Sequence, residues 1–175
     1  GVTVTKTYTL TRGSYVVHMA QTIRNQGQQA WRGQAYHQLE RVIPPKPKDQ
    51  NFLERYGNPA NYGFIGAAWY SPDENYNQIK FDDFKDHPLG ENGQVGRKVG
   101  SGWIAMQETY FTSAWLPPSK QPGTLSTAVI GSGDDAHYLI RDIGPLLDVA
   151  PGQSTTSQAR LFLGPKLPGV LKTVE

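Results

Sequence analysis

Val2-Thr3-Val4-Thr5-Lys6-Thr7-Tyr8-Thr9-Leu10 opens the chain with side chains that alternate in character at every position. The threonines fall on one side, and the other side is apolar except for Lys6. A period of two residues is typical of a β-strand with one buried face. The stretch therefore predicts a half-buried strand from Val2 to Leu10 and favours a β fold.

The residues that follow extend this pattern into a hairpin and further strands. Thr11-Arg12-Gly13-Ser14 has the composition of a turn, and the alternation resumes from Tyr15 to Asn25. Bounded by Gly, Pro, Asn or Asp, further strands are expected at 30–42, 64–70, 78–81, 103–116, 125–130, 137–143 and 155–163. Eight or nine strands without a long helix predict an all-β sandwich.

The candidate strand from Trp103 to Leu116 is apolar on both faces. Such a strand belongs in the middle of a sheet that is covered on each side. Pro117-Pro118 is expected to end it, because proline cannot donate a hydrogen bond to a neighbouring strand.

Two segments lack a strand pattern, and the tail has a helical one. A long loop of unknown role is expected at 43–62, with one short helical turn at Phe52 to Tyr56, and a polar, Gly-rich segment at 86–102. After Gly164-Pro165, apolar residues recur at helical spacing (Leu167, Val170, Leu171 and Val174). We expect a sandwich domain over 1–163 and a helical segment that begins within 164–175.

The composition excludes several classes of function. The 175 residues fit one domain, and the net charge is +2 with its basic residues scattered, so a nucleic-acid partner is not expected. There is no cysteine, which excludes disulfides, thiolate metal sites and a cysteine nucleophile. No run of about 18 apolar residues is present to span a membrane.

The motifs that would indicate an enzyme are missing from the sequence. The four histidines (His18, His37, His87 and His137) have no metal-ligand spacing, although adjacent strands could bring His18 and His37 together. On a strand, the adjacent acids in Asp73-Glu74 and in Asp82-Asp83 would point to opposite faces, so neither pair can act as two catalytic carboxylates on one bond. The stretch Ser132-Gly133-Asp134-Asp135 indicates a turn rather than a calcium loop. We expect no catalytic residue, no cofactor and no metal.

Aromatic residues are abundant on the candidate strands, among them Trp31, Tyr36, Trp69, Tyr70, Trp103, Tyr110, Phe111 and Trp115. Core and cross-strand packing is the ordinary role of such residues. A cleft for an apolar ligand, a sugar or an extended peptide is the alternative.

Three stretches closely resemble the large periplasmic domain of Gram-negative YidC insertases. They are Phe64-Ile65-Gly66-Ala67-Ala68-Trp69-Tyr70-Ser71-Pro72-Asp73-Glu74 with Lys80-Phe81-Asp82, Gly102-Trp103-Ile104-Ala105-Met106 through Tyr110-Phe111 to Ala114-Trp115-Leu116-Pro117, and Leu161-Phe162-Leu163-Gly164-Pro165-Lys166. The opening Thr5-Lys6-Thr7-Tyr8 with Leu10 and Arg12-Gly13 is similar too. Together they cover nearly the whole chain in the family's order.

The resemblance implies a β-supersandwich of the galactose-mutarotase type, in a periplasm-facing, non-catalytic domain of a bacterial inner-membrane protein. Partners implied are accessory subunits of the Sec translocon and nascent membrane proteins, and contact with the membrane is made through the full-length protein only. The segment 164–175 is expected to lead to the second membrane helix and to matter for insertion. The residues that carry these implications are the motif positions Gly66, Tyr70, Pro72, Trp103, Tyr110, Phe111, Trp115 and Pro117, and the tail positions Gly164, Pro165, Leu167, Val170 and Leu171.

Two further expectations stay open at this stage. The family's domain has a comparable stretch before the strand at Val2, so this chain is expected to correspond to the second half of the supersandwich, with open strand edges that favour a homodimer. The alternative function is a carbohydrate-binding or aldose-epimerase-like protein, which requires paired histidines and a carboxylate in one cleft or an exposed aromatic platform.

Overall fold

A computed structural model of the protein describes residues 1–43, 63–90 and 96–171. Within them, eleven strands form two antiparallel sheets, which confirms the predicted all-β sandwich. The seven-stranded sheet has the order β1-β2-β11-β8-β7-β4-β5, and the four-stranded sheet has the order β3-β10-β9-β6. Their bounds are β1 Val2–Leu10, β2 Val16–Asn25, β3 Trp31–Val42, β4 Gly66–Ser71, β5 Asn75–Lys80, β6 Arg97–Val99, β7 Trp103–Gln107, β8 Phe111–Leu116, β9 Gly123–Ile130, β10 His137–Val149 and β11 Ser154–Pro165.

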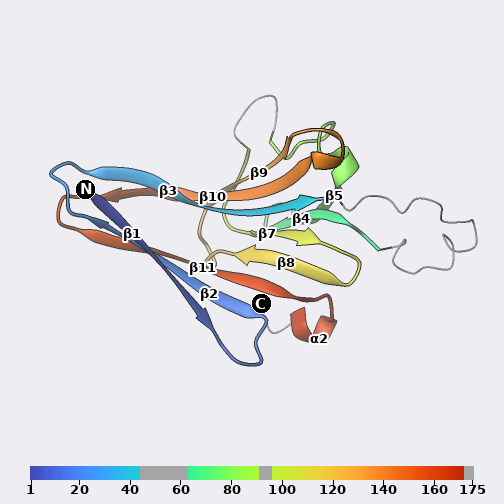
Figure 1. Ribbon diagram of the computed structural model, residues 1–175, viewed down its shortest axis with the longest axis horizontal. Helices are drawn as coiled ribbons and strands as arrows, with labels where there is room; N and C mark the ends of the chain where they lie inside the picture. Colours follow the sequence, from blue (N-terminus) through green and yellow to red (C-terminus); the bar gives the residue numbers. More distant parts are fainter. Residues whose placement is uncertain (44–62, 91–95, 172–175) are drawn as a thin grey trace, which may run out of the picture.

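The two sheets lie as layers, with β3, β10 and β9 in one and β1, β2, β11 and β8 in the other (Figure 1). Three short helices complete the described part: η2 (Phe81–Asp83), η3 (Gly133–Asp135) and α2 (Pro168–Leu171). None of the helices in the described ranges is long and apolar enough to cross a membrane.

The main core fills the space between the sheets. Side chains that alternate along the central strands supply one half of it, and the four-stranded sheet and η2 supply the rest. Its members include Trp69, Ile104, Leu125 and Ile140, with Trp115 packed against them. Burial of these groups is the main stabilising contribution to the fold.

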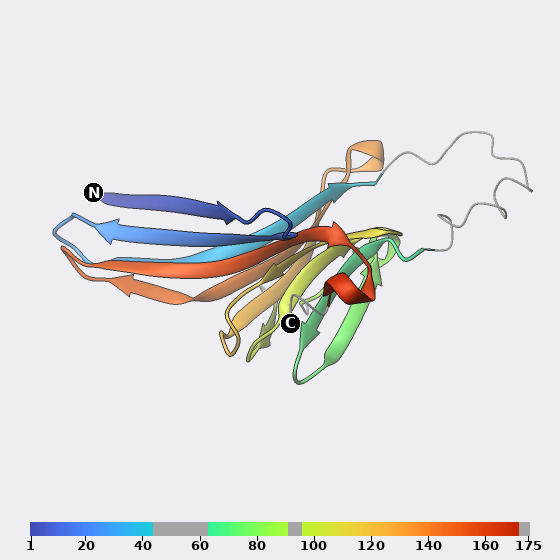
Figure 2. The ribbon, with the colours of Figure 1, turned by 90° about the horizontal axis from the view of Figure 1, so that it is seen from below.

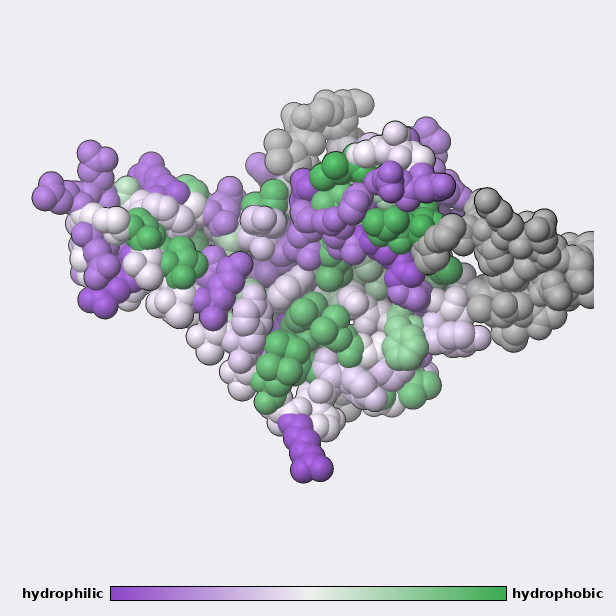
Figure 3. All heavy atoms as spheres, in the orientation of Figure 1, coloured by the Kyte–Doolittle hydropathy of each residue, from purple (hydrophilic) through white to green (hydrophobic). Residues whose placement is uncertain are grey.

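The strand β1 is where the prediction of half-burial is wrong. The alternation did identify the strand and its hairpin with β2, in the register Val2↔Asn25 to Leu10↔Val17. However, all nine residues of β1 are exposed, because no strand of the second sheet in the described ranges covers this edge. Figure 3 shows a band of apolar side chains over the ends of β1, β2 and β11, where Leu10, Val17 and Leu161 share one cross-strand row.

The predicted single strand from Trp103 to Leu116 is also wrong, because it is two strands. β7 ends at Gln107 and β8 begins at Phe111, and the Glu108 amide donates to the Phe111 carbonyl at 2.9 Å across the turn. Both strands are central, as their two apolar faces indicated. The alternation continued on both sides of the turn, so it did not reveal the break.

Other boundaries differ by a few residues, and one strand was missed. β6 lies in the segment expected to be polar and irregular, where three residues pair with β9. β10 continues to Val149 across an irregularity between Ile143 and Leu146. The tail helix α2 is present, whereas Val174, the predicted loop residues 44–62 and the helical turn at Phe52–Tyr56 lie outside the described residues.

Candidate binding groove

A groove of about 1290 Å³ lies on the outer face of the seven-stranded sheet, away from the second sheet. Residues 67, 69, 104 and 106 point into the main core, so their neighbours 68, 70, 103 and 105 point outward by the alternation of a strand. The strands β2, β11, β8, β7, β4 and β5 all contribute to its lining. The same alternation that builds the core thus also builds this second surface.

The floor of the groove is a row of small side chains. Ala68, Ala105 and Ala114 occupy directly opposite positions on β4, β7 and β8, and the row continues to Phe162 on β11. All four are buried and form a second apolar cluster, which Val16, Trp103, Leu116 and Val170 flank. Of this row, Ala105, Ala114 and Phe162 line the groove. Because β7 and β8 present only a methyl group here, the sheet surface is low at these positions.

Gly66, also on β4, allows this strand to lie close to β5. A Cβ at Gly66 would lie 2.2 Å from the carbonyl oxygen of Ile79 on the paired strand β5. A side chain there would therefore push β4 and β5 apart.

An aromatic wall borders the alanine row. Tyr70 on β4 and Trp103 on β7 are opposite each other, with ring centroids 6.1 Å apart and planes at 18°. Tyr76 on β5 lies opposite Tyr70 and also has its ring 6.1 Å from Trp103. These rings give the groove large, rigid apolar surfaces with polar tips.

The C-terminal helix α2 closes one part of the groove. Val170 packs against the alanine and Phe162 cluster, and Leu171 lines the groove. Figure 2 shows α2 in front of the sheet. The approach to α2 is fixed by Lys166, whose amide donates to the Tyr110 carbonyl at 2.8 Å and whose Nζ donates to the Glu108 carbonyl at 3.1 Å.

The charged side chains that line the groove are all basic, and a histidine lies beside them. The cations are Lys120, Arg160 and Lys166, the histidine is His18, and no Asp or Glu of the described residues lines the groove. His18 and Arg160 sit opposite each other on β2 and β11, with Leu116 next in the same row. The nearby Glu108 carboxylate forms an ion pair with Arg41 instead. Burial lowers the pKa of Arg41, but an arginine stays protonated at neutral pH.

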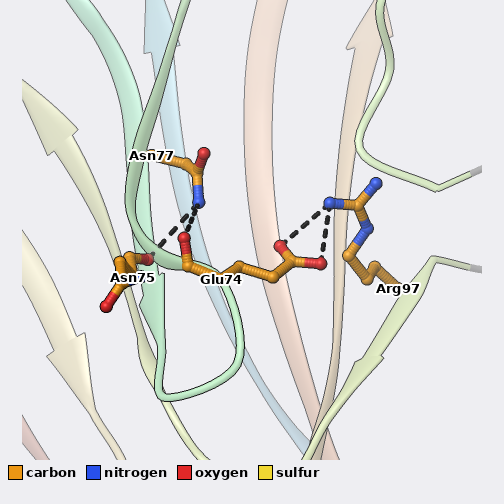
Figure 4. Close-up of polar contacts among 4 residues, drawn as sticks. All are labelled: Glu74, Asn75, Asn77 and Arg97. Atoms are coloured by element: carbon orange, nitrogen blue, oxygen red, sulfur yellow. Dashed lines mark hydrogen bonds and ion pairs between the residues drawn. The ribbon is translucent and has the colours of Figure 1, made fainter.

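The turn between β4 and β5 is tied to the second sheet. Figure 4 shows the Arg97 guanidinium of β6 facing the Glu74 carboxylate, and Nη1 donates to both oxygens at 2.9 Å. Asn77 donates from its side chain to the carbonyls of Glu74 and Asn75, which holds the turn in shape although Asn75 has a φ of +60°. The turn positions Tyr70 and Tyr76 at its two ends.

The predicted motif residues fall into two groups in the structure. Tyr70, Trp103, Pro117 and Leu171 line the groove, and Val170 packs on its floor. The others lie elsewhere. Trp115 faces the main core, where its Nε1 donates to the Gln38 carbonyl at 3.2 Å. Tyr110 and Phe111 are exposed at the β7–β8 turn, and Pro72 is exposed in the β4–β5 turn. Pro165 is the last residue of β11, opposite Phe111, and Leu167 lies between β11 and α2.

The histidines do not meet in one site. His37 is buried between the sheets with Nδ1 3.7 Å from Asp142 Oδ2, and neither of its ring nitrogens has a hydrogen-bond partner. His137 lies on the surface with Nδ1 2.6 Å from Glu40 Oε1. His18 is in the groove on the other sheet. The described residues therefore lack the two histidines and a carboxylate in one cleft that an epimerase site requires, and they contain no group of three or more metal-ligating side chains.

Sequence reasoning missed the floor and the charges of the groove. Phe162 and the alanines belong to the stretches that carry the family resemblance, but they were not predicted to form a site. Arg160, Lys166 and Tyr76 were not predicted as site residues either. A signal was available, because Arg160 and Phe162 alternate along one strand and Ala68, Ala105 and Ala114 each sit beside a large core residue. That signal does not predict which strands pair, and it is the pairing of strands distant in sequence that brings the alanines and Phe162 into one row.

Comparisons with known proteins place this sandwich among related sequences. The family model described as "YidC periplasmic domain" matches residues 1–175. A membrane protein insertase YidC of Xylella fastidiosa (strain 9a5c) is 38% identical over 168 residues, covering 95% of this chain and 27% of the relative. One of Methylococcus capsulatus is 38% identical over 175 residues, covering 99% and 29%. The chain thus spans less than a third of the length of these relatives.

A solved structure is similar in fold. The galactose mutarotase related enzyme from Lactobacillus acidophilus matches with a TM-score of 0.50 and 9% identity, over 93% of this chain and 61% of that one. At this identity the match bears on the fold alone, and it agrees with the mutarotase-type sandwich expected from the sequence.

Proposed function

Because the chain belongs to the YidC periplasmic domain family, we propose that it is an interaction module of a membrane protein insertase and performs no catalysis. In this proposal it faces the periplasm from the inner membrane and binds segments of membrane proteins during insertion or folding. Contacts with accessory subunits of the Sec translocon are proposed on the same family basis.

The groove on the seven-stranded sheet is the observation that carries this proposal. A concave surface with an apolar floor and a few polar groups at its margin is the ordinary form of a binding site. The alanine row gives room for apolar side chains, and the rings of Tyr70, Tyr76 and Trp103 give them a surface to pack on. An extended polypeptide segment fits such an open, elongated surface.

A role for the segment from Gly164 onward is proposed from the position of α2. Gly164 has no room for a Cβ, which would lie 2.8 Å from the Phe162 ring and 2.9 Å from the Tyr15 ring. Val170 and Leu171 then bring α2 onto the groove. A segment that leads from this groove toward a membrane helix would connect binding on the sandwich with the membrane part of the protein.

The proposal is tested in the whole protein that carries this chain, by an insertion assay on membrane vesicles. Deleting the sandwich strands is expected to weaken binding of membrane-protein segments to the protein while leaving insertion itself largely intact, whereas deleting the segment from Gly164 onward is expected to impair insertion. The reverse result would contradict the proposed roles of the two parts.

Sugar binding is a second candidate, which the aromatic wall favours. Tyr76 is 48% exposed and lies beside Trp103, and flat aromatic surfaces of this kind can stack against sugar rings. Titration of the chain with a panel of oligosaccharides, followed by tryptophan fluorescence, distinguishes the two. Saturable quenching that disappears in Trp103→Ala would support sugar binding over the proposed polypeptide binding.

Self-association through the edge strand β1 is proposed as a property of the chain by itself. Its outer edge has no strand partner among the described residues, and both of its faces are exposed. Lys6 is the central residue of β1, so pairing of two copies in a symmetric antiparallel register would place two lysines opposite each other. Dimer content in light scattering is therefore expected to rise in Lys6→Thr, and a concentrated sample that stays monomeric in both forms would contradict the proposal.

A further inference from the structure

The distribution of acidic residues between the two sheets is uneven. The seven strands that form the larger sheet contain no Asp or Glu at any position. The acidic strand residues are Glu40, Asp142 and Asp148, and all three lie on β3 and β10 of the smaller sheet. The chain as a whole has almost as many acidic as basic residues, 15 against 17, so its overall composition does not explain this separation.

Three cations line the groove and flank its apolar floor. Arg160 lies on β11, whereas Lys120 and Lys166 lie in the segments that follow β8 and β11. Arg160, Phe162, Gly164 and Lys166 follow one another at every second position, with Phe162 in the floor between the two cations. His18 lies opposite Arg160 on β2. Six positions of extended chain separate Arg160 from Lys166, which is about 20 Å.

These charges are not neutralised within the described part of the chain. Arg160 and Lys120 have no ion pair with another described residue, and Lys166 donates to the Glu108 carbonyl and not to its carboxylate. The Glu108 carboxylate is paired with Arg41. A cation next to an apolar surface attracts an anionic group that approaches with an apolar partner.

We infer that the groove selects extended polypeptide segments in which acidic residues flank an apolar centre. This inference rests on the proposed function and names the chemistry of its ligand. An extended segment of about six residues covers the distance between Arg160 and Lys166, so acidic side chains at its two ends meet the two cations while apolar ones between them face Phe162 and the neighbouring Ala114. The glutamines of the lining, at positions 78, 107 and 158, offer neutral amide groups for its backbone.

A polypeptide fits these observations better than an anionic membrane surface does. Ala105, Ala114 and Phe162 line a concave surface, whose floor a planar bilayer cannot reach. A lipid surface would contact the marginal cations alone and would make no use of the floor.

The test measures fluorescence anisotropy of three labelled ten-residue peptides with the whole chain of 175 residues. The peptides share an apolar centre of Leu, Val and Phe and carry Glu, Gln or Lys at both ends. We expect saturable binding of the Glu peptide, weaker binding of the Gln peptide and the weakest binding of the Lys peptide. The affinity for the Glu peptide should fall as the salt concentration rises.

Charge reversal identifies the residues responsible. Arg160→Glu with Lys166→Glu should weaken binding of the Glu peptide about tenfold, since each exposed pair contributes modestly and each reversal turns attraction into repulsion. The matched control is Lys85→Glu with Lys98→Glu, which makes the same change of charge at exposed positions outside the groove and should leave binding unchanged.

The results that would overturn this inference differ from those that would overturn the proposed function. Equal binding of all three peptides would overturn the charge selection and leave the groove as a polypeptide site. Binding to vesicles of phosphatidylglycerol and phosphatidylcholine that is lost in the charge-reversed variant, without peptide binding, would overturn the inference in favour of lipid. If no peptide binds, the inference falls, and cross-linking in the whole protein decides the proposed function separately.

Discussion

Replacing Phe162 by alanine should damage both the fold and the docking of α2. Phe162 is 1% exposed, lies at the end of the alanine row and packs with Val170. Truncating a fully buried phenylalanine removes its burial energy and leaves a cavity, which together destabilise by about 3–5 kcal/mol. For a domain of this size, about 2–4 °C of melting temperature is lost per kcal/mol, so a decrease of roughly 6–20 °C is expected.

Leu163→Ala is the matched control for this change. Leu163 is the next residue of the same strand, points to the opposite face and is 48% exposed, so its truncation should destabilise by about 1 kcal/mol. Urea unfolding followed by tryptophan fluorescence measures both losses, and hydrogen exchange at the amides of Val170 and Leu171 reports the release of α2. Equal losses of stability in the two variants, or unchanged exchange at α2 in Phe162→Ala, would refute the packing argument.

Two further substitutions test the parts of the sheet that shape the groove. Gly66→Ala would place a Cβ 2.2 Å from the Ile79 carbonyl oxygen and should lower the free energy of unfolding by about 2–5 kcal/mol. In the control Gly100→Ala, the new Cβ has no atom within 4 Å, so the free energy should change by less than about 0.5 kcal/mol. Equal effects of the two substitutions in denaturant unfolding would contradict the expected clash. A double-mutant cycle of Glu74→Ala and Arg97→Ala should give a coupling energy of about 0.2–1 kcal/mol that decreases in about 1 M salt, because this ion pair is partly exposed. A larger coupling energy that does not change with salt concentration would mean that the pair is buried in solution.

Local sequence patterns predicted the strands well and their surroundings poorly. The alternation from Val2 to Leu10 identified β1 with its observed bounds, because the period of a strand depends on the strand alone. Whether its apolar face is covered depends on which other strands lie opposite, and the sequence of β1 contains no information on that. Half-burial of β1 was therefore predicted wrongly.

The split of the strand 103–116 had a similar cause. Glu108, Thr109 and Tyr110 form the turn, yet none of them is a glycine, proline, asparagine or aspartate, which are the residues that usually mark one. The missed strand β6 has only three residues, too few for a period to appear.

The candidate site was predictable in its parts and not in its assembly. The aromatic residues Tyr70 and Trp103 were named from the sequence, and the structure stacks them at the groove. Trp115 was named with them and lies in the main core instead, because its position on β8 faces the second sheet. The face on which a strand residue points is fixed by pairing between distant segments, which a single sequence does not reveal.

Site-specific photo-cross-linking in the whole protein determines whether the outer face of the seven-stranded sheet binds polypeptide. Tyr76, in the groove, and Tyr36, on the four-stranded sheet, are both exposed tyrosines, at 48% and 65%, and each can be replaced by p-benzoylphenylalanine with little change of shape. With a membrane protein undergoing insertion, we predict cross-links from position 76 and few or none from position 36. Cross-links from position 36 at equal or greater yield would contradict the account.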